Sequence, residues 1–469
     1  AAFFGRGGGR GTRAVASFDE DTTSMGVEAA RAALADADGV RPEQVWFATA
    51  RPAYHDKSNA ATVCAATRLV PDVAALDLGG ALRNGAGALR AALTGRGRIL
   101  VVSADIRVGR PTSPEEATGG DAAAAVLVGD DADGTLVAEH LGSAAVTDEF
   151  LERWTLPGET TSRTWEERFG ETVYGPLVDA AWSAALADAG VDAAAVDKVV
   201  VAGMHTRAVR RARSRLGVAD TALVDDLTAE IGNPGTAQAG LLLAHLLDGA
   251  RPGEVLALVS LADGVEVVVV RATGAVADRR PSRPLAAQIA AGGPVSYARF
   301  LSWRDQVTVE PPNRPAPSRP SASAAYRRRD WKYGFVASRD RTSGMLHLPP
   351  ARVSEKGGAV DDMEPVPMAD TAGTIVSLTV DRLVYSPSPP VLFPVVDFDG
   401  GGRAPLELTD ATPGEVGVGD RVEPTFRRLY TADGIHNYFW KVRPVRFGPH
   451  LDRDPAHAPD VAGATGEVR

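Results

Sequence analysis

The sequence predicts an α/β fold over its first 275 residues and an all-β barrel toward its C-terminal end. Short apolar runs alternate with amphipathic helical patterns between residues 22 and 275, the arrangement typical of a largely buried sheet. A connector rich in proline, serine and arginine follows, up to about residue 330. After residue 371, strand-like runs are separated by proline, glycine and aspartate turns, which favours a small barrel.

The first region begins with a helix for which Thr22 or Thr23 is a suitable cap. The expected helices cover residues 22–37, 59–70, 84–95, 174–190 and 235–249. The expected strands cover residues 44–50, 74–80, 98–105, 122–130 and 198–205, followed by a strand pair over 254–272. A turn at Asp263-Gly264 joins that last pair.

The remaining chain divides by composition. Residues 276–330 are expected to form a linker, with one short helix in the segment SYARFLSWRDQ. Barrel strands are expected within residues 371–448, and residues 449–469 are expected to be disordered.

Bulk properties exclude several classes of protein. The 469 residues are too many for one ordinary core and indicate two or three domains. The net charge of -10 argues against a general nucleic-acid-binding protein. One cysteine, Cys64, allows neither an internal disulfide framework nor a cysteine-rich zinc site, and we expect a cytoplasmic protein. No apolar run is long enough for a membrane span, and the N-terminal residues do not form a signal peptide.

Four motifs in order give residues 13–275 a family resemblance. They are RAVASFDEDTTSMGVEAARAAL, LDLGGALRNGAGAL, VVVAGMHTRA and EIGNPGTAQAGLLLAHLLD. The region resembles the thiolase superfamily, and within it the hydroxymethylglutaryl-CoA synthases and the ketoacyl-carrier synthase III enzymes. The resemblance implies an α/β, five-layered fold of two similar halves and a homodimer. The first strand of the family fold has no counterpart in this sequence.

Residues 295–446 resemble the OB-fold domain that accompanies thiolases and acyl-CoA hydratases, through SYARFLSWRD, GTIVSLTVDRL, VVDFDGGGRAPLELTD and GIHNYFWKVRPVR. In that family a zinc ribbon with paired cysteines precedes the barrel. Here residues 331–370 occupy its place, and its four ligand positions fall at Asp340, Ser343, Ser354 and Gly357. One carboxylate cannot hold a structural zinc ion. We therefore expect a degenerate ribbon without metal.

The resemblance places the family's nucleophilic cysteine at Leu82 and the synthase general-acid glutamate at Ala50. Leucine neither ionises nor accepts an acyl group, so a covalent acyl-enzyme route is closed. Cys64 falls on the apolar face of a helix and is expected to be a packing residue.

His205 and Asn233 keep the family positions of the remaining catalytic residues. His205 follows a strand, where ligand sites of parallel sheets gather, although it could instead cap the strand end. Asn233 lies in a turn and could either complete that turn or donate to an oxyanion. Together they predict an oxyanion-type pocket.

Weaker candidates surround this pocket. Tyr54 and His55, in a loop near the pocket mouth, and Arg207 and Arg210, which could meet the phosphates of a thioester carrier, are expected to bind substrate. Other polar groups receive structural interpretations. Trp154 and Tyr174 are expected to pack beneath a helix, Glu115 and Glu116 to lie in a solvated loop, and His436, Tyr438 and Trp440 to pack the barrel or, alternatively, to face a substrate or partner.

Two functions remain open. The first is non-covalent carbon–carbon chemistry on an acyl thioester of CoA or phosphopantetheine: aldol, retro-aldol, retro-Claisen or decarboxylation. The second is a non-catalytic scaffold that binds an active thiolase or hydratase and channels its thioester. No bound cofactor, metal, nucleic acid or membrane is expected in either case. Nucleic-acid binding by the OB fold is a weaker third idea, against which the acidity argues.

Overall fold

The computed structural model describes residues 11–165, 167–278, 281–310 and 312–445. The tail expected over 449–469 lies outside these residues. In the described part, none of the helices combines the length and the apolar character that crossing a bilayer requires.

The first half of the α/β region is built on a four-stranded sheet of order β2-β1-β3-β4. Strands β2, β1 and β3 are parallel, and β4 runs antiparallel to β3. The strands are β1 (Gln44–Thr49), β2 (Ala74–Gly79), β3 (Ile99–Ile106) and β4 (Asp121–Val128), and the helices are α1 (Thr22–Ala35), α2 (Ala60–Ala66), α3 (Asn84–Leu93) and α4 (Pro114–Thr118). Asp21, rather than either threonine, caps α1 by accepting the Ser24 N–H at 2.9 Å.

The second half repeats this plan with the order β8-β9-β10-β5. Its strands are β5 (Ala138–Thr147), β8 (Lys198–Gly203), β9 (Val255–Leu261) and β10 (Gly264–Ala272), and its helices are α5 (Glu167–Ala189), α6 (Thr206–Arg213), α7 (Thr228–Ile231) and α8 (Gln238–Asp248). A parallel pair is followed by an antiparallel strand in both sheets. In the second half β5 adds a further antiparallel strand beyond β10. Within the described residues, no strand pairs with the matching edge of β4.

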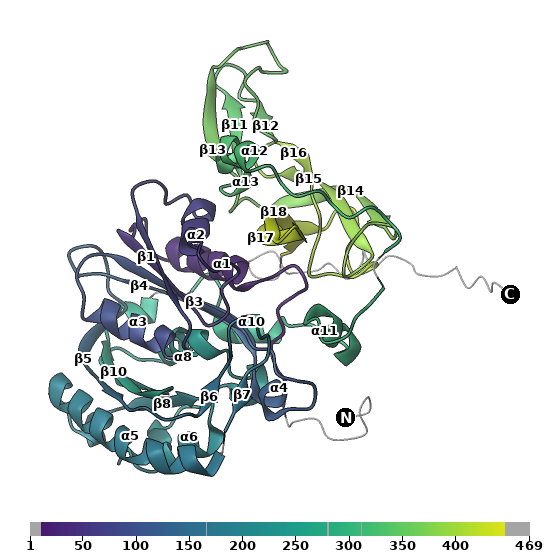
Figure 1. The fold of residues 1–469 in the computed structure, drawn as a ribbon. Coiled ribbons are helices and arrows are strands. Elements are labelled where there is room, and N and C mark those ends of the chain that lie inside the picture. The colour runs from purple at the N-terminus through teal and green to yellow at the C-terminus, as the bar shows by residue number, and fades with distance from the viewer. Residues whose placement is uncertain (1–10, 166, 279–280, 311, 446–469) are drawn as a thin grey trace, which may run out of the picture.

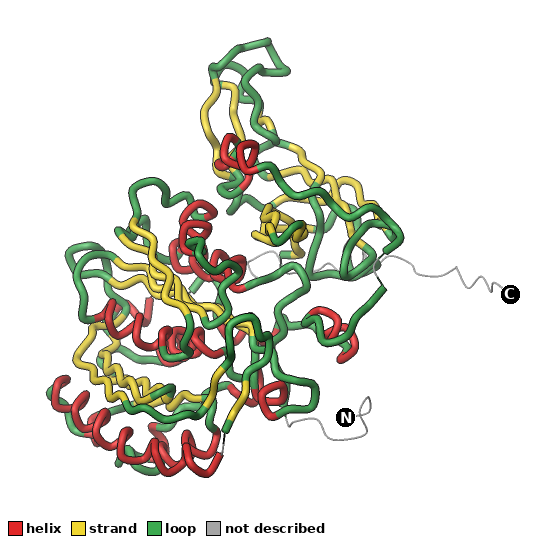
Figure 2. The backbone as a smooth tube through the Cα atoms, in the orientation of Figure 1, coloured by secondary structure: helices red, strands yellow, loops and turns green. Residues whose placement is uncertain are grey.

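Helices and sheets stack in five layers (Figures 1 and 2). Helices α1 and α2 cover the outer face of the first sheet, α3 and α8 lie between the sheets, and α5 and α6 cover the outer face of the second. The central contact is close, because a Cβ on Gly85 of α3 would lie 1.9 Å from the Thr236 carbonyl oxygen. The expected five-layered fold of two similar halves is confirmed.

The connector is more structured than the sequence suggested. The one short helix expected between residues 276 and 330 is present as α11 (Tyr297–Trp303), and the chain forms further short helices that are too short to be detected by their apolar periodicity. They are α9 (Ala275–Asp278), α10 (Leu285–Ala290) and α12 (Ala322–Arg327), and α13 (Arg329–Lys332) follows. Before α5, the short strands β6 (Arg153–Trp154) and β7 (Arg163–Thr164) form a separate antiparallel hairpin.

The ribbon segment folds as a three-stranded sheet of order β12-β11-β13. Its strands are β11 (Val336–Asp340), β12 (Leu346–His347) and β13 (Met363–Pro367). Three of the four positions expected for zinc ligands meet through hydrogen bonds. Asp340 accepts hydrogen bonds from the Ser343 hydroxyl and from the Thr342 N–H at 2.9 Å, and the Ser354 hydroxyl beside it also favours its charged form. These bonds lower the pKa of Asp340 to about 2.

The barrel is a five-stranded antiparallel sheet of order β16-β15-β14-β17-β18. Its strands are β14 (Gly373–Asp381), β15 (Val391–Phe398), β16 (Arg403–Pro405), β17 (Arg421–Ala432) and β18 (Ile435–Pro444). Leu408 bridges β15 on one side and β18 on the other, so the sheet curls toward closure. The expected OB-type barrel is confirmed.

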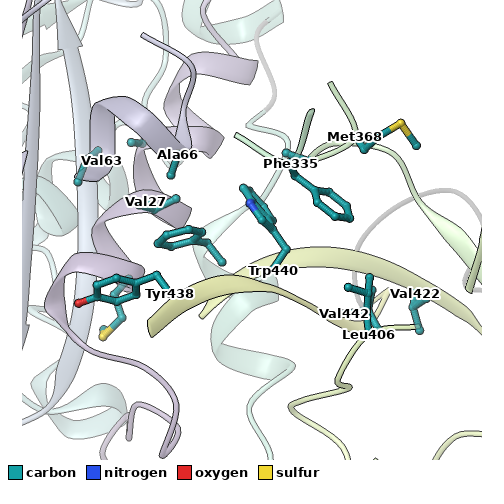
Figure 3. Close-up of a cluster of buried hydrophobic side chains, with 14 of the residues drawn as sticks. Val27, Val63, Ala66, Phe335, Met368, Leu406, Val422, Tyr438, Trp440 and Val442 are labelled. Carbon is teal, nitrogen blue, oxygen red and sulfur yellow. The ribbon is translucent and has the colours of Figure 1, made fainter. Parts of the chain in front are cut away.

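The barrel and the first sheet share one hydrophobic core (Figure 3). Val27 on α1 and Val63 on α2 belong to the same buried cluster as Phe335, Trp440 and Val442. Tyr438 also donates from its hydroxyl to the Asp21 carboxylate at 2.6 Å. The aromatic residues of β18 therefore fix the barrel to α1, instead of facing a substrate.

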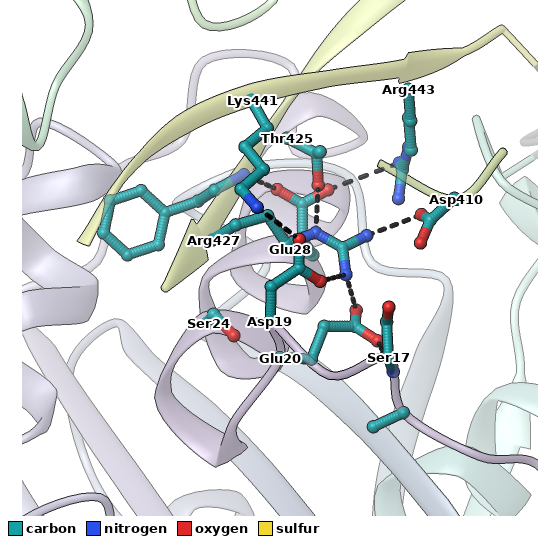
Figure 4. Close-up of polar contacts among 12 residues, drawn as sticks. Ser17, Asp19, Glu20, Ser24, Glu28, Asp410, Thr425, Arg427, Lys441 and Arg443 are labelled. Atoms are coloured by element: carbon teal, nitrogen blue, oxygen red, sulfur yellow. Dashed lines mark hydrogen bonds and ion pairs between the residues drawn. The ribbon is translucent and has the colours of Figure 1, made fainter. Parts of the chain in front are cut away.

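A buried ionic cluster completes this contact (Figure 4). Arg427 pairs with Glu20 at 2.8 Å, with Asp410 at 2.7 Å and with Asp19 at 3.4 Å, and Lys441 pairs with Asp19 at 2.9 Å. Desolvation would raise the pKa of Asp19, but Lys441 and Arg427 lower it to about 2. Both domains thus contribute charges that stabilise one another.

Candidate functional site

Leu82 lies in the turn between β2 and α3. Gly80 adopts a φ of +101° there, a conformation that glycine takes without steric cost. A Cβ on Gly235 would lie 3.1 Å from Leu82 Cδ2 and 3.2 Å from Arg107 Cδ. The turn that follows Asn233 therefore packs against Leu82, and the side chain at this point is aliphatic.

Cys64 does not supply a nucleophile to this turn. It lies in α2 within the core shared with the barrel and is 1% exposed. Burial raises the pKa of its thiol to about 11, so the thiol is protonated at neutral pH.

Ala50 lies at the carboxyl end of β1, against a buried acid that the sequence analysis did not single out. Its N–H donates to Asp105 Oδ1 at 2.9 Å, and the Thr236 N–H donates to Oδ2 at 2.9 Å. Burial raises the pKa of Asp105. In the sequence, Asp105 could have been identified from its position directly after the apolar run ILVVSA, at the end of a strand where binding sites of parallel sheets form.

Asn233 is buried, and its side chain completes its own turn. Oδ1 accepts the Gly235 N–H at 2.9 Å, and Nδ2 donates to Gln238 Oε1 at 2.7 Å. Within the described residues this is the one bond from Nδ2, although an amide nitrogen carries two hydrogens. Both interpretations from the sequence therefore stand: the amide shapes the turn and retains a hydrogen to donate.

His205 caps the N-terminus of α6 at the carboxyl end of β8. Its Nδ1 accepts the Ala208 N–H at 3.0 Å, so the neutral ring carries its proton on Nε2. The ring lies against α5, because a Cβ on Gly170 would lie 3.0 Å from Nε2. The contacts of His205 are therefore with α5 and α6, whereas Leu82 and the Asn233 turn contact each other.

A tyrosine–carboxyl pair lies beside His205. Tyr174, one turn after Gly170 on α5, donates from its hydroxyl to Glu152 Oε2 at 2.5 Å. Burial raises the pKa of Glu152, and Tyr174 and the His205 charge partly oppose this shift. Tyr174 is buried as expected. Glu152 was not identified in the sequence analysis, because its approach to Tyr174 depends on the chain between β5 and α5.

Arginines gather between the Leu82 turn and the Tyr174–Glu152 pair. Arg107 pairs with Glu115 at 2.6 Å, and Arg153 pairs with the other oxygen of the same carboxylate. Arg51 donates to the Glu159 carbonyl at 3.0 Å. Glu115 is 4% exposed, so its expected place in a solvated loop was wrong: tertiary contacts with two arginines bury it.

Tyr54 and His55 line a cavity of about 310 Å³ at the carboxyl ends of β1 and β2. Thr49 and Pro52, on either side of Arg51, also line it. The Tyr54 hydroxyl accepts the His436 N–H of β18 at 2.6 Å, so the barrel helps to position this wall.

Arg207 and Arg210 are exposed on α6, the helix that His205 caps. They lie outside the arginine group around Glu115 and do not line this cavity. Their expected role toward phosphates stays a prediction.

Comparisons with known proteins agree with this architecture. The chain is 29% identical over 260 residues to the hydroxymethylglutaryl-CoA synthase of Pyrococcus furiosus, covering 54% of this chain and 74% of that protein. The synthase of Methanocaldococcus jannaschii is 26% identical over 311 residues, covering 63% of this chain and 88% of that protein.

Solved structures show the same fold. MvaS in complex with 3-hydroxy-3-methylglutaryl coenzyme A matches with a TM-score of 0.55 and 22% identity, covering 65% of this chain and 85% of that one. The curacin-pathway HMG synthase in complex with acetyl donor-ACP matches with a TM-score of 0.51 and 20% identity, covering 62% and 78%.

At the other end, residues 365–427 match the family described as ChsH2, C-terminal OB-fold domain. The similarity to the synthases therefore lies in the first region, and the similarity to the OB-fold family lies in the barrel. The first region is thus similar in sequence to hydroxymethylglutaryl-CoA synthases and shares the fold of their solved structures, and residues 365–427 match the ChsH2 C-terminal OB-fold domain.

Proposed function

We propose that this protein acts on an acyl thioester of CoA or a carrier protein by carbon–carbon bond chemistry without a covalent acyl-enzyme. The homologues support the thioester, since one neighbour binds 3-hydroxy-3-methylglutaryl coenzyme A and another an acetyl donor carrier protein. Leu82 and the buried, protonated Cys64 support the absence of an acyl-enzyme.

The observation that carries the proposal is the His205 environment. The imidazole Nδ1 accepts the Ala208 N–H, and the nearby Glu152 carboxyl, bound to Tyr174, has a pKa that burial raises. A histidine near an acid of raised pKa can move a proton to or from a thioester enolate or a β-hydroxyl group. The remaining Nδ2 hydrogen of Asn233 can donate to the developing oxyanion.

We further propose a homodimer formed through the edge strand β2. Leu76 on β2 is 49% exposed, and within the described residues no strand covers the outer edge of β2. An exposed strand edge is a template for pairing with another chain.

The same edge is the observation that favours the alternative. If β2 pairs with a different thiolase-like chain, this subunit serves as a scaffold for an active thiolase or hydratase. The direct salt bridges of Glu115 with two arginines, which occupy the space near Leu82, also suit a silent site.

A turnover assay separates these functions. The purified chain is incubated with a panel of β-hydroxyacyl- and β-ketoacyl-CoA thioesters, and the products are identified by mass spectrometry. We expect turnover that His205→Ala lowers by about a hundredfold or more, with no acyl adduct on the intact protein. Activity that appears only when a thiolase is added would instead identify the scaffold, and an acetylated polypeptide would exclude the non-covalent route.

A further inference from the structure

Three arginines surround the carboxyl edge of the first sheet, beside Leu82. Arg107 is 2% exposed, and its aliphatic stem contacts the same Gly235 that contacts Leu82. Arg51 follows β1, and Arg153 comes from β6 in the second half. The group therefore draws on both halves of the α/β region, as an enclosed ligand site does.

Carboxylates within the protein only partly match these guanidinium groups. Arg107 and Arg153 share the single carboxylate of Glu115. Arg51 pairs with no carboxylate among the described residues and donates to a backbone carbonyl, that of Glu159. Three further acids face the group at longer range: Asp105 faces Arg107 and Arg51, Asp121 faces Arg107, and Asp263 faces Arg153.

Buried donors are left over. In the part of the chain that the structure describes, the Nε of Arg107 and the Nε of Arg153 are buried without a hydrogen-bond partner. A buried donor without a partner is uncommon and calls for an explanation, such as an absent ligand. Desolvation lowers the pKa of all three arginines, and Arg107 adds repulsion to both Arg51 and Arg153. An added anion would relieve that repulsion.

The position of the group indicates which part of a ligand it meets. Arg51 lies between Thr49 and Pro52, two residues that line the cavity of about 310 Å³, a volume within the usual range of ligand pockets. Arg107 reaches the Leu82 turn at the other end. A thioester bound beside Leu82 would therefore lie next to the Arg107 side chain, which shares the Glu115 carboxylate with Arg153.

We propose that Arg51, Arg107 and Arg153 form a subsite for a carboxylate carried by the acyl group of the substrate. The inference rests on the proposed thioester function and narrows its substrate class to monothioesters of dicarboxylic acids. Guanidinium groups suit this role because they bind carboxylates through two parallel hydrogen bonds. Glu115 occupies part of the subsite as an internal carboxylate.

A matched pair of ligands tests the subsite on the full chain. The probes are thioether analogues of succinyl-CoA and butyryl-CoA, which have acyl groups of equal length with and without a terminal carboxylate. We expect the succinyl analogue to bind about tenfold more tightly or better in calorimetry. Arg51→Met and Arg153→Met should each remove most of that preference, whereas the exposed Arg352→Gln should keep it. Equal affinity for both analogues in the unchanged protein would overturn the proposal.

Glu115→Gln gives the opposite result and guards against misfolding as an explanation. Removing the internal carboxylate should tighten binding of the succinyl analogue, because two guanidinium groups lose their partner. Unchanged or weaker binding in this variant, with the thermal transition retained, would contradict the subsite.

Free succinate and butyrate separate this inference from the proposed function. If neither CoA analogue binds, the thioester function fails. Succinate that still binds more tightly than butyrate, and loses this advantage in Arg51→Met, would then support the carboxylate subsite alone. Equal binding of the two free acids would overturn the subsite as well.

Discussion

Two buried groups of charges in this protein differ in how they are matched. At the contact between barrel and α1, Arg427 and Lys441 have raised pKa values and Asp19 a lowered one. At the candidate site, the pKa values of Arg107 and Arg153 are lowered and those of Asp105 and Glu152 are raised. In the first group Arg427, Lys441 and Asp19 stabilise one another's charged forms, although burial and the neighbouring acids raise the pKa of Glu20. In the second, desolvation favours the neutral forms.

The contrast separates a structural role from a functional one. A closed network of ion pairs holds two domains in one register, although such pairs add little net stability over apolar packing. Residues whose charged forms are disfavoured lack a sufficient charge partner within the protein, which a bound ligand can supply. Residues with such perturbed pKa values concentrate at functional sites. Burial alone would not distinguish the two regions, since both are largely enclosed.

Breaking the matched network should have the largest effect on stability. Arg427→Ala leaves the acids at Asp19, Glu20 and Asp410 without their shared partner. We expect the free energy of unfolding to fall by about 3–5 kcal/mol, the cost of an uncompensated buried charge. Urea unfolding followed by circular dichroism measures it. A loss below about 1 kcal/mol would mean that the barrel is held by its apolar contacts alone.

The acid limb of the stability profile should show the same network. Because Asp19 has a pKa of about 2 instead of its ordinary 3.8, its contribution is fully present above pH 4 and is lost as the pH falls toward 2. This contribution is about 2 kcal/mol.

Unfolding free energies measured between pH 6 and pH 2 should therefore fall more steeply for the unchanged protein than for Asp19→Asn. Parallel curves would show that Asp19 does not carry this pH dependence.

Features that depend on residues close in the sequence could be predicted, whereas features that depend on contacts between distant residues could not. Strands such as 99–106 depend on local apolar runs, and the five-layered fold follows from their alternation with helices. The positions of Leu82, His205 and Asn233 came from the motifs that resemble the thiolase superfamily, each of which includes the end of a recognisable strand or turn. Local patterns alone were sufficient for the main strands and helices.

Charged residues could not be assigned in this way. Glu115 stands in the polar segment SPEEATG, which is typical of solvent-exposed loops, yet Arg153 reaches it from the other half of the fold. Glu152, in the segment between β5 and α5, meets Tyr174 on α5, and Arg51 donates to the Glu159 carbonyl of the same segment. Whether a charge is matched depends on such long-range contacts, and a single sequence does not reveal them.

At the candidate site, Tyr174→Phe should have a moderate effect on stability. The variant removes the hydroxyl that donates to Glu152 at 2.5 Å and should lower the unfolding free energy by about 1–2 kcal/mol. That hydrogen bond lowers the pKa of Glu152, so its loss should raise this pKa and move the acidic limb of the rate profile to higher pH. An unshifted profile in an active variant would remove Glu152 from the proton transfer.

The smallest expected change in stability is also the sharpest test of the comparison. Arg153→Met leaves Glu115 paired with Arg107 and removes a guanidinium whose pKa burial and Arg107 lower to about 9. A lowered cationic pKa means that, below it, the charged form opposes folding. We therefore expect the free energy of unfolding of this variant to stay within about 1 kcal/mol of that of the unchanged protein, or to be higher. Substitutions of residues that serve function at a cost to stability often raise the stability in this way.

A loss comparable to that of Arg427→Ala, measured in the same urea titration, would show that Arg153 is a structural partner of Glu115. The two charge networks would then not differ in kind. An unchanged or raised stability, combined with weaker binding of the carboxylate ligand, would separate them, because removing one partner of a buried structural ion pair usually lowers the stability by several kcal/mol.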